Sequence, residues 1–181
     1  IKNGKLNAEI IVGSPDPHGE FKARARDGHY AIDLALLLGS ICSTPKNFST
    51  KLDVDVDPKL NHGNMIIVGG PVTNLVCSKI NDFLPAYFDQ KNNWTLVSKK
   101  ESYNDENIGI IARIPNPYDN QYSILLIAGI RYSGTKAAVI GLTRHSELIL
   151  NRFSDQKEFV CIVQGFDLDG DGKIDSVEAL E

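Results

Sequence analysis

One stretch of the chain, Ser123–Leu150, constrains the possible folds most strongly. It begins with a short apolar run, Ile124–Ala128, of the kind that forms a strand covered on both faces. Gly129 ends this run, Ser133 and Gly134 offer a helix start, and apolar residues then return at helical spacing. The stretch therefore predicts a central strand, a turn and a helix.

Two upstream stretches repeat this order of strand and helix. Glu9–Ser14 is followed by the helical pattern of Ala25–Leu38, and Met65–Gly70 is followed by that of Val72–Leu84. Three such units predict an α/β fold of three layers around a mostly parallel sheet. The first of the two helices is apolar on nearly every side, which predicts that it is buried on more than one side.

Two further regions predict a hairpin and an edge strand in addition to these three units. Trp94–Lys99 and Asn107–Ile114 are extended in character and predict an antiparallel hairpin inserted before the central strand. Aspartate alternates with valine over Asp53–Asp57, which predicts an exposed edge strand. Three aspartates on one face of a strand cannot wrap an ion, so a solvated acidic face is expected there.

Composition and charge exclude several classes of function. A chain of 181 residues with 42% hydrophobic residues can bury the core of one domain. The net charge of −4 is concentrated in Asp167–Glu181, which holds six acidic residues and one lysine. No stretch clusters Lys and Arg with aromatic residues, so nucleic-acid binding is not expected. No apolar run approaches the ~20 residues of a membrane span, and the chain begins with Ile1, so we expect a piece of a longer protein.

The cysteines and two asparagines leave the compartment open. Cys42, Cys77 and Cys161 have no metal-binding spacing, and buried thiols are expected, with one disulfide and a leftover thiol as the alternative. Two Asn-x-Ser/Thr triplets, at Asn47 and Asn93, permit glycosylation of a secreted chain.

A loop after the first strand suggests one enzyme class. An apolar strand leading into Asp16-Pro17-His18-Gly19 resembles the start of the dinuclear metallophosphoesterases, where Asp and His are metal ligands. The second strand ends in Val68–Pro71, where that family would place a further Asp. A metal-dependent hydrolase using strand-end loops around Asp16, His18 and Arg131 therefore stays an alternative, against two residues that only shape a loop.

The turn after the central strand resembles a phosphate-binding loop only in part. Glycines at the two ends of Gly129–Gly134 have the required spacing, but Lys136 follows a threonine instead of the second glycine. Nucleotide binding is therefore not expected, although Arg131 beside a helix start could hold an anion. His145 falls on the apolar face of the helix and is expected to be a packing residue.

The strongest motif lies near the carboxyl end, where Asp167–Glu178 matches the twelve-residue calcium loop of EF-hands. Glycine stands at position 6, and Ile174 at position 8 can pack inward. The predicted metal ligands are the side chains of Asp167, Asp169, Asp171, Asp175 and Glu178, and the backbone carbonyl of Lys173. Five carboxylates this close repel one another, so Ca²⁺ is the expected cofactor. Magnesium and a solvated acidic tail without an ion remain alternatives.

The surroundings of this loop differ from those of a signalling EF-hand. A strand precedes the loop, and only Val177–Glu181 follows it. We therefore expect residues 1–166 to form the α/β domain, and residues 167–181 to add a calcium loop and a short terminal helix to it. Without a second helix pair to open, the loop is expected to be a structural clamp.

The chain resembles the archaeal S-layer proteins, in particular their C-terminal portion. Four segments carry the resemblance: Ile67–Asn74, Ile114–Pro117, Leu126–Ala138 and Asp167–Glu181. The resemblance implies secretion, a location at the cell surface, contacts with copies of itself or with the rest of a longer chain, and no catalysis. The sequence thus predicts a calcium-binding structural module, with the metal-dependent hydrolase as the alternative.

Overall fold

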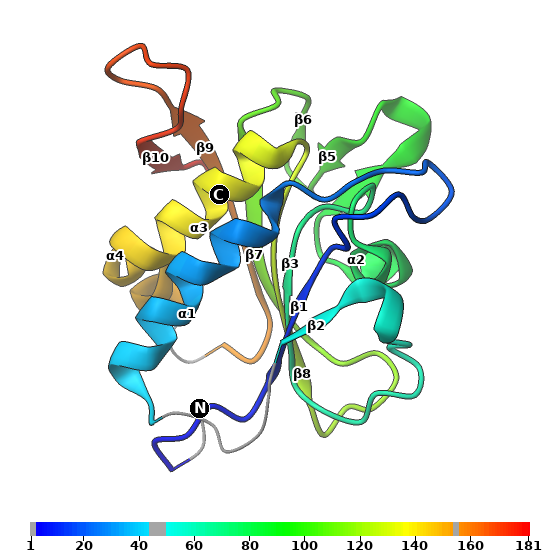
Figure 1. Ribbon diagram of the computed structural model, residues 1–181. Helices are drawn as coiled ribbons and strands as arrows, with labels where there is room; N and C mark the ends of the chain where they lie inside the picture. The colour runs from blue at the N-terminus through cyan, green and yellow to red at the C-terminus, as the bar shows by residue number, and fades with distance from the viewer. Residues whose placement is uncertain (1–2, 44–49, 154–155) are drawn as a thin grey trace.

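The molecule is built around one seven-stranded sheet, in the order β10-β9-β7-β8-β3-β1-β2 (Figure 1). The computed structural model describes residues 3–43, 50–153 and 156–181. The strands of this sheet are β1 (Glu9–Val12), β2 (Thr50–Leu52), β3 (Met65–Val68), β7 (Ile108–Pro115), β8 (Ser123–Gly129), β9 (Phe159–Phe166) and β10 (Ser176–Ala179). All of them run in one direction except β7 and β10, which run in the other. The predicted mostly parallel α/β sheet is confirmed.

Both faces of this sheet are covered (Figure 1). One face carries the helices α1 (Tyr30–Ile41), α3 (Tyr132–Arg144) and α4 (Ser146–Leu150). The other carries α2 (Leu75–Ile80) and a small antiparallel sheet of β4 (Tyr87–Asp89), β5 (Thr95–Val97) and β6 (Ser102–Tyr103). Short 3₁₀ turns complete the elements: η1 (Asp27–His29), η2 (Asp53–Asp55), η3 (Asn81–Phe83), η4 (Gln90–Asn92) and η5 (Asn151–Phe153).

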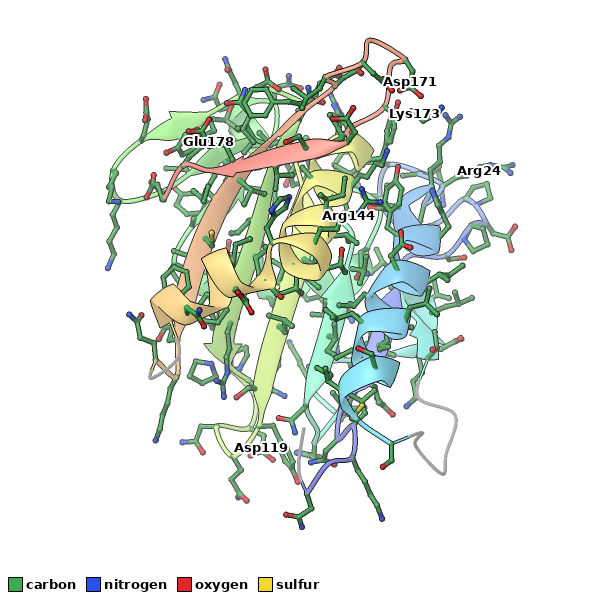
Figure 2. All side chains as sticks on the ribbon, turned by 90° about the vertical axis from the view of Figure 1, so that its left-hand side faces the viewer. Arg24, Asp119, Arg144, Asp171, Lys173 and Glu178 are labelled. Atoms are coloured by element: carbon green, nitrogen blue, oxygen red, sulfur yellow. The ribbon has the colours of Figure 1, made fainter. Side chains whose placement is uncertain are left out.

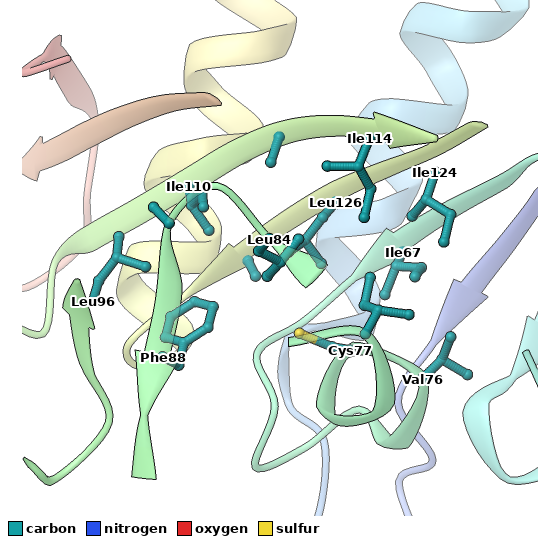
Figure 3. Packing of buried hydrophobic residues seen from close by; sticks show 14 of the residues in the cluster. Ile67, Val76, Cys77, Leu84, Phe88, Leu96, Ile110, Ile114, Ile124 and Leu126 are labelled. Atoms are coloured by element: carbon teal, nitrogen blue, oxygen red, sulfur yellow. The ribbon is translucent and has the colours of Figure 1, made fainter. Parts of the chain in front are cut away.

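The central strands are apolar throughout because each face of the sheet has its own core. In β3, Ile66 and Val68 pack toward α1 and α3, whereas Met65 and Ile67 pack toward α2. This alternation follows from the two-residue period of a strand. Figure 3 shows the core on the α2 side of the sheet, in which Ile67 and strand β8 face the helix that carries Cys77.

Helix α1 is less buried than its sequence predicts. Ala31 and Leu34 are buried, but Ile32 and Leu36 on the outer side are 62% and 69% exposed. The expected burial on more than one side is therefore wrong, because in the described residues α1 packs with one face only, against α3 and the sheet.

The predicted hairpin before the central strand does not form. The segment that starts at Trp94 supplies β5, which pairs with β4 and β6 in the small sheet. The second segment supplies β7, which pairs on both edges with β8 and β9 in the large sheet. Strand β7 is almost entirely apolar, so two strand neighbours and the core bury it better than a single hairpin partner.

The alternating aspartates also depart from prediction. The edge strand β2 ends at Leu52, and Asp53 begins the turn η2 with only 1% of its surface exposed. Asp55 and Asp57 are exposed as expected. The solvated acidic face is therefore wrong for Asp53, whose buried partners are described below.

The carboxyl end forms a strand, and the predicted short terminal helix is wrong. Ser176–Ala179 is β10, which pairs antiparallel with β9. Val177 and Ala179 pack against the core on the helix side of the sheet. Pairing there also satisfies hydrogen-bonding groups on the outer edge of β9, which a helix would leave unpaired.

His145 does not pack into the core as its helical position predicts. It is exposed and stands between α3 and α4, where the backbone leaves the helical conformation. The helical register that would bring it to the buried face is broken at this residue.

Cys42 and Cys77 are free thiols, so a disulfide among the three cysteines, the predicted alternative, is not realised. Cys77 and Cys161 are buried and Cys42 is half-buried. Cys77 packs on the α2 side of the sheet and Cys161 on the α3 side, and they serve as small apolar residues of the two cores.

Candidate functional site

The acidic loop, residues 167–175, connects β9 to β10 and brings three carboxylates together. Oxygen atoms of Asp167, Asp169 and Asp175 all lie within 4.8 Å of one another. Asp167 and Asp169 are exposed, and Asp175 is half-buried. Three of the predicted metal ligands therefore converge at one point of the surface.

Backbone amides hold the loop around Asp167. Its carboxylate accepts hydrogen bonds from the amides of Gly170 at 2.8 Å, Asp171 at 3.2 Å and Gly172 at 2.7 Å. Gly170 and Gly172 have φ angles of +79° and +82°, a conformation that favours glycine. The two glycines of the motif thus allow the chain to turn around the first aspartate.

The remaining predicted ligands lie differently. Asp171 accepts a hydrogen bond from the ammonium of Lys173 at 2.7 Å, and this contact lowers the pKa of Asp171. Glu178 lies on β10 opposite Gln164, outside the group of three carboxylates (Figure 2). The side chain of Ile174 is buried in the core near α3, as its position in the motif predicts.

The segment after the loop is anchored twice. The amide of Leu180 donates to the carbonyl of Ile162 in β9 at 2.8 Å. The Glu181 carboxylate accepts hydrogen bonds from Ser98 Oγ at 2.7 Å and Tyr103 Oη at 2.6 Å in the small sheet. Burial, and then the contact with Glu181, raises the pKa of Tyr103. The tail thus joins the two sheets, a link that no local sequence pattern indicates.

The chemistry of the acidic loop suits a hard divalent cation. Carboxylate and carbonyl oxygens are the ligands that Ca²⁺ prefers, and the three clustered aspartates occupy positions 1, 3 and 9 of the calcium motif. Without a cation, neighbouring carboxylates repel one another. In the described part of the chain, no other cluster brings three metal-ligating side chains together.

The loop that contains Asp16 and His18 is built as a structural contact. His18 Nε2 lies 2.9 Å from Asp53 Oδ2, and His18 Nδ1 donates to the carbonyl of Asp16 at 2.7 Å. The Asp53 carboxylate also accepts from the amides of Ser14 and Leu75, each at 2.7 Å. Both ring nitrogens of His18 are therefore engaged within the protein, and the hydrolase interpretation has no support.

The same contacts favour the protonated form of His18. Burial acts to lower its pKa, but the hydrogen bond to the Asp16 carbonyl and the Asp53 carboxylate act to raise it, and the net pKa is raised. A carbonyl only accepts hydrogen bonds, so Nδ1 carries a proton while Nε2 donates to the carboxylate. The arrangement is an ion pair that joins the loops after β1 and β2 to the start of α2.

The turn between β8 and α3 is not arranged as a phosphate-binding loop. The amide of Gly134 donates to the carbonyl of Glu106 at 3.1 Å, and Ser133 Oγ donates to the same carbonyl at 2.9 Å. These donors hold the start of α3 against the segment before β7. Arg131 is exposed at the N-cap of the helix and makes no side-chain capping bond.

Comparison with known proteins adds a family match. A family model described as "S-layer like family, outer domain" matches residues 43–145, more than half of the chain. The matched segment runs from just after α1 to the end of α3 and includes the small sheet. No curated protein matches the chain.

Proposed function

The chain belongs to the S-layer like family, and on that premise we propose that it is a calcium-binding structural module of a secreted, archaeal surface-layer protein. The family implies a location at the cell surface and a structural role. Within the described residues, no helix is long and apolar enough to span a membrane. Of the two glycosylation triplets, Asn93 is exposed, and Asn47 lies outside the described residues.

The convergence of Asp167, Asp169 and Asp175 carries the calcium proposal. The carbonyl of Lys173 and the side chain of Asp171 complete the proposed ligand set, and Asp171 would exchange its contact with the Lys173 ammonium for the ion. Glu178 lies apart from this group. Calcium neutralises the repulsion between the carboxylates and fixes the loop between β9 and β10.

Adding calcium is expected to stabilise the protein measurably. Extracellular modules bind Ca²⁺ with dissociation constants of about 10⁻⁴–10⁻³ M. At 100 times the dissociation constant, binding to the folded form contributes about 2.7 kcal/mol. For a chain of this length, that corresponds to a Tm increase of roughly 5–11 °C, measured by scanning calorimetry with calcium and with a chelator.

Two variants separate the proposed ligands from the rest of the motif. Asp167→Asn should abolish the calcium-dependent increase in Tm, because it removes one charge from the carboxylate group. Glu178→Gln removes one charge from β10 and should leave most of the increase intact. A wild-type Tm that does not change in 10 mM calcium would contradict the proposal.

We also propose that copies of the module contact one another through the outer face of α1. Ile32 and Leu36 stand four residues apart and are 62% and 69% exposed, so they form one apolar stripe. Exposed apolar stripes on helices are characteristic of interaction surfaces. The family's role in surface layers agrees with self-association through such a stripe.

Leu36→Glu is expected to weaken self-association about 10–100-fold, because burying a leucine contributes about 1.5–3 kcal/mol. Sedimentation velocity over a concentration series measures this change. Leu60→Glu is the matched control, since Leu60 is 76% exposed but lies outside α1. Equal effects of the two substitutions, or a wild-type chain that stays monomeric at millimolar concentration, would rule out α1 as the contact.

A further inference from the structure

A cavity of about 150 Å³ lies at the edge of the sheet where β3 and β8 end. We call it the arginine pocket, after Arg24, Arg26 and Arg131, which line it together with Asp27, Trp94 and Tyr132. Arg24, which Figure 2 labels, and Arg26 lie in the segment before α1, and Arg131 lies at the N-cap of α3. Residues distant in the sequence therefore meet around one small space.

The topology of the sheet favours a ligand at this place. Strand β1 is followed by α1 on one face of the sheet, whereas its neighbour β3 is followed by α2 on the other face. The loops after these two parallel strands diverge and leave a crevice at their carboxyl ends. Crevices of this kind are the usual ligand sites of open α/β sheets.

The charge of the pocket is not balanced by the protein. In the described part of the chain, none of the three guanidinium groups forms an ion pair or a side-chain hydrogen bond. Among the described residues that line the pocket, Asp27 is the only acidic one. Guanidinium groups bind carboxylate and phosphate oxygens through paired hydrogen bonds, so unpaired arginines around a cavity suit an oxyanion.

Asp27 is the buried acidic residue of the pocket wall. Its side chain is only 3% exposed, and Oδ2 accepts from Thr135 Oγ1 at 3.3 Å while Oδ1 has no hydrogen-bond partner. A buried polar atom without a partner costs stability, so it calls for an explanation. Burial also raises the pKa of Asp27.

Gly69 lies close to Asp27, and the aromatic residues Trp94 and Tyr132 line the pocket. Gly69 has a φ of +116°, and a Cβ there would lie 3.0 Å from Asp27 Oδ2, so glycine allows the strand end to approach this carboxyl group. Trp94 is held by an edge contact with Phe21, with ring centroids 5.6 Å apart. Tyr132 is 56% exposed. Flat aromatic surfaces beside charged groups suit a ligand with a compact carbon skeleton.

We propose that the arginine pocket binds a small organic anion such as an acidic sugar. The carboxylate or phosphate group of this anion contacts Arg24, Arg26 and Arg131. This inference does not depend on calcium or on self-association, since the pocket shares no residue with the acidic loop or with the outer face of α1.

Isothermal titration calorimetry tests the proposal, with the protein kept in a chelator so that no calcium is bound. The probes are glucuronate, which carries a carboxylate, and glucose 6-phosphate, which carries a phosphate, with neutral glucose as the comparison. We expect at least one charged sugar to bind with a millimolar or lower dissociation constant and glucose to bind at least tenfold more weakly. The probe that binds more tightly identifies which oxyanion the pocket prefers.

Two arginine variants test whether the charged sugar binds in the arginine pocket. Arg131→Gln should weaken binding of the charged sugar by at least tenfold, because it removes one charged hydrogen-bond donor. Arg113→Gln makes the same change in charge on β7, away from the pocket, and should leave the affinity within twofold. Failure of both charged sugars to bind at 10 mM, or equal losses in the two variants, overturns the proposal.

Discussion

Replacing Asp53 by alanine is expected to lower the free energy of unfolding by about 3–5 kcal/mol, the cost of breaking a buried ion pair. The side chain is 1% exposed and accepts hydrogen bonds from His18 and from the amides of Ser14 and Leu75. Alanine leaves the His18 ring and the amides of Ser14 and Leu75 without this partner. Three segments that are distant in sequence lose their common anchor.

Thermal and urea denaturation measure this loss, which for a chain of this length corresponds to a Tm decrease of roughly 6–20 °C. Asp55→Ala is the matched control, because Asp55 lies in the same 3₁₀ turn but is exposed. Its substitution should change stability by less than about 0.5 kcal/mol. Similar results for the two variants would show that Asp53 does not anchor the loops.

The pH dependence of stability tests the ionic part of this contact. Because the pKa of His18 is raised in the folded chain, its contribution is fully present below about pH 6.5, the pKa of an unperturbed histidine. The contribution is lost as the pH rises through the raised value. The free energy of unfolding of the wild type should therefore fall as the pH rises from 6.5 through the raised pKa. The free energy of unfolding of His18→Gln should stay at its pH 6 value over the same range.

The elements that were predicted correctly are those specified by local patterns. Apolar runs bounded by glycine identify β3 and β8, because a strand covered on both faces has no polar positions. The pairing of β7 with β9 was not predictable in the same way, since no local pattern says which distant strand supplies the second edge. The prediction of a terminal helix is wrong for the same reason, because pairing with the edge of β9 decides the conformation of Ser176–Ala179.

The candidate sites also differ in whether their residues are close together in the sequence. Asp167, Asp169 and Asp175 lie within nine consecutive residues, and their convergence was predictable from spacing and two glycines. The alternating pattern predicts a solvated Asp53, because its partners His18 and Leu75 come from other segments. The sequence places Arg131 beside a helix start, but Arg24 and Arg26 join it only when the ends of the strands are brought together.

Asn74→Ala is the second substitution for which we expect a large effect, a loss of roughly 2–4 kcal/mol. The side chain of Asn74 is fully buried, and its oxygen accepts hydrogen bonds from the amides of Val76 and Cys77 at the start of α2. Its nitrogen donates to the carbonyls of Val68 and Ile11, at 3.1 and 3.4 Å. Alanine removes the helix cap and both hydrogen bonds from Asn74 to the strand ends.

Urea denaturation gives the size of the loss, and hydrogen exchange locates it, since the amides at the start of α2 should lose protection first. Thr73→Ala is the matched control in the same loop, because the hydroxyl of Thr73 makes only a long contact of 3.5 Å with Gly70. That variant should stay within about 0.5 kcal/mol of the wild type. If the two variants were equally stable, the hydrogen bonds of Asn74 would not hold β1, β3 and α2 together, and the carboxyl edge of the sheet would depend on apolar packing alone.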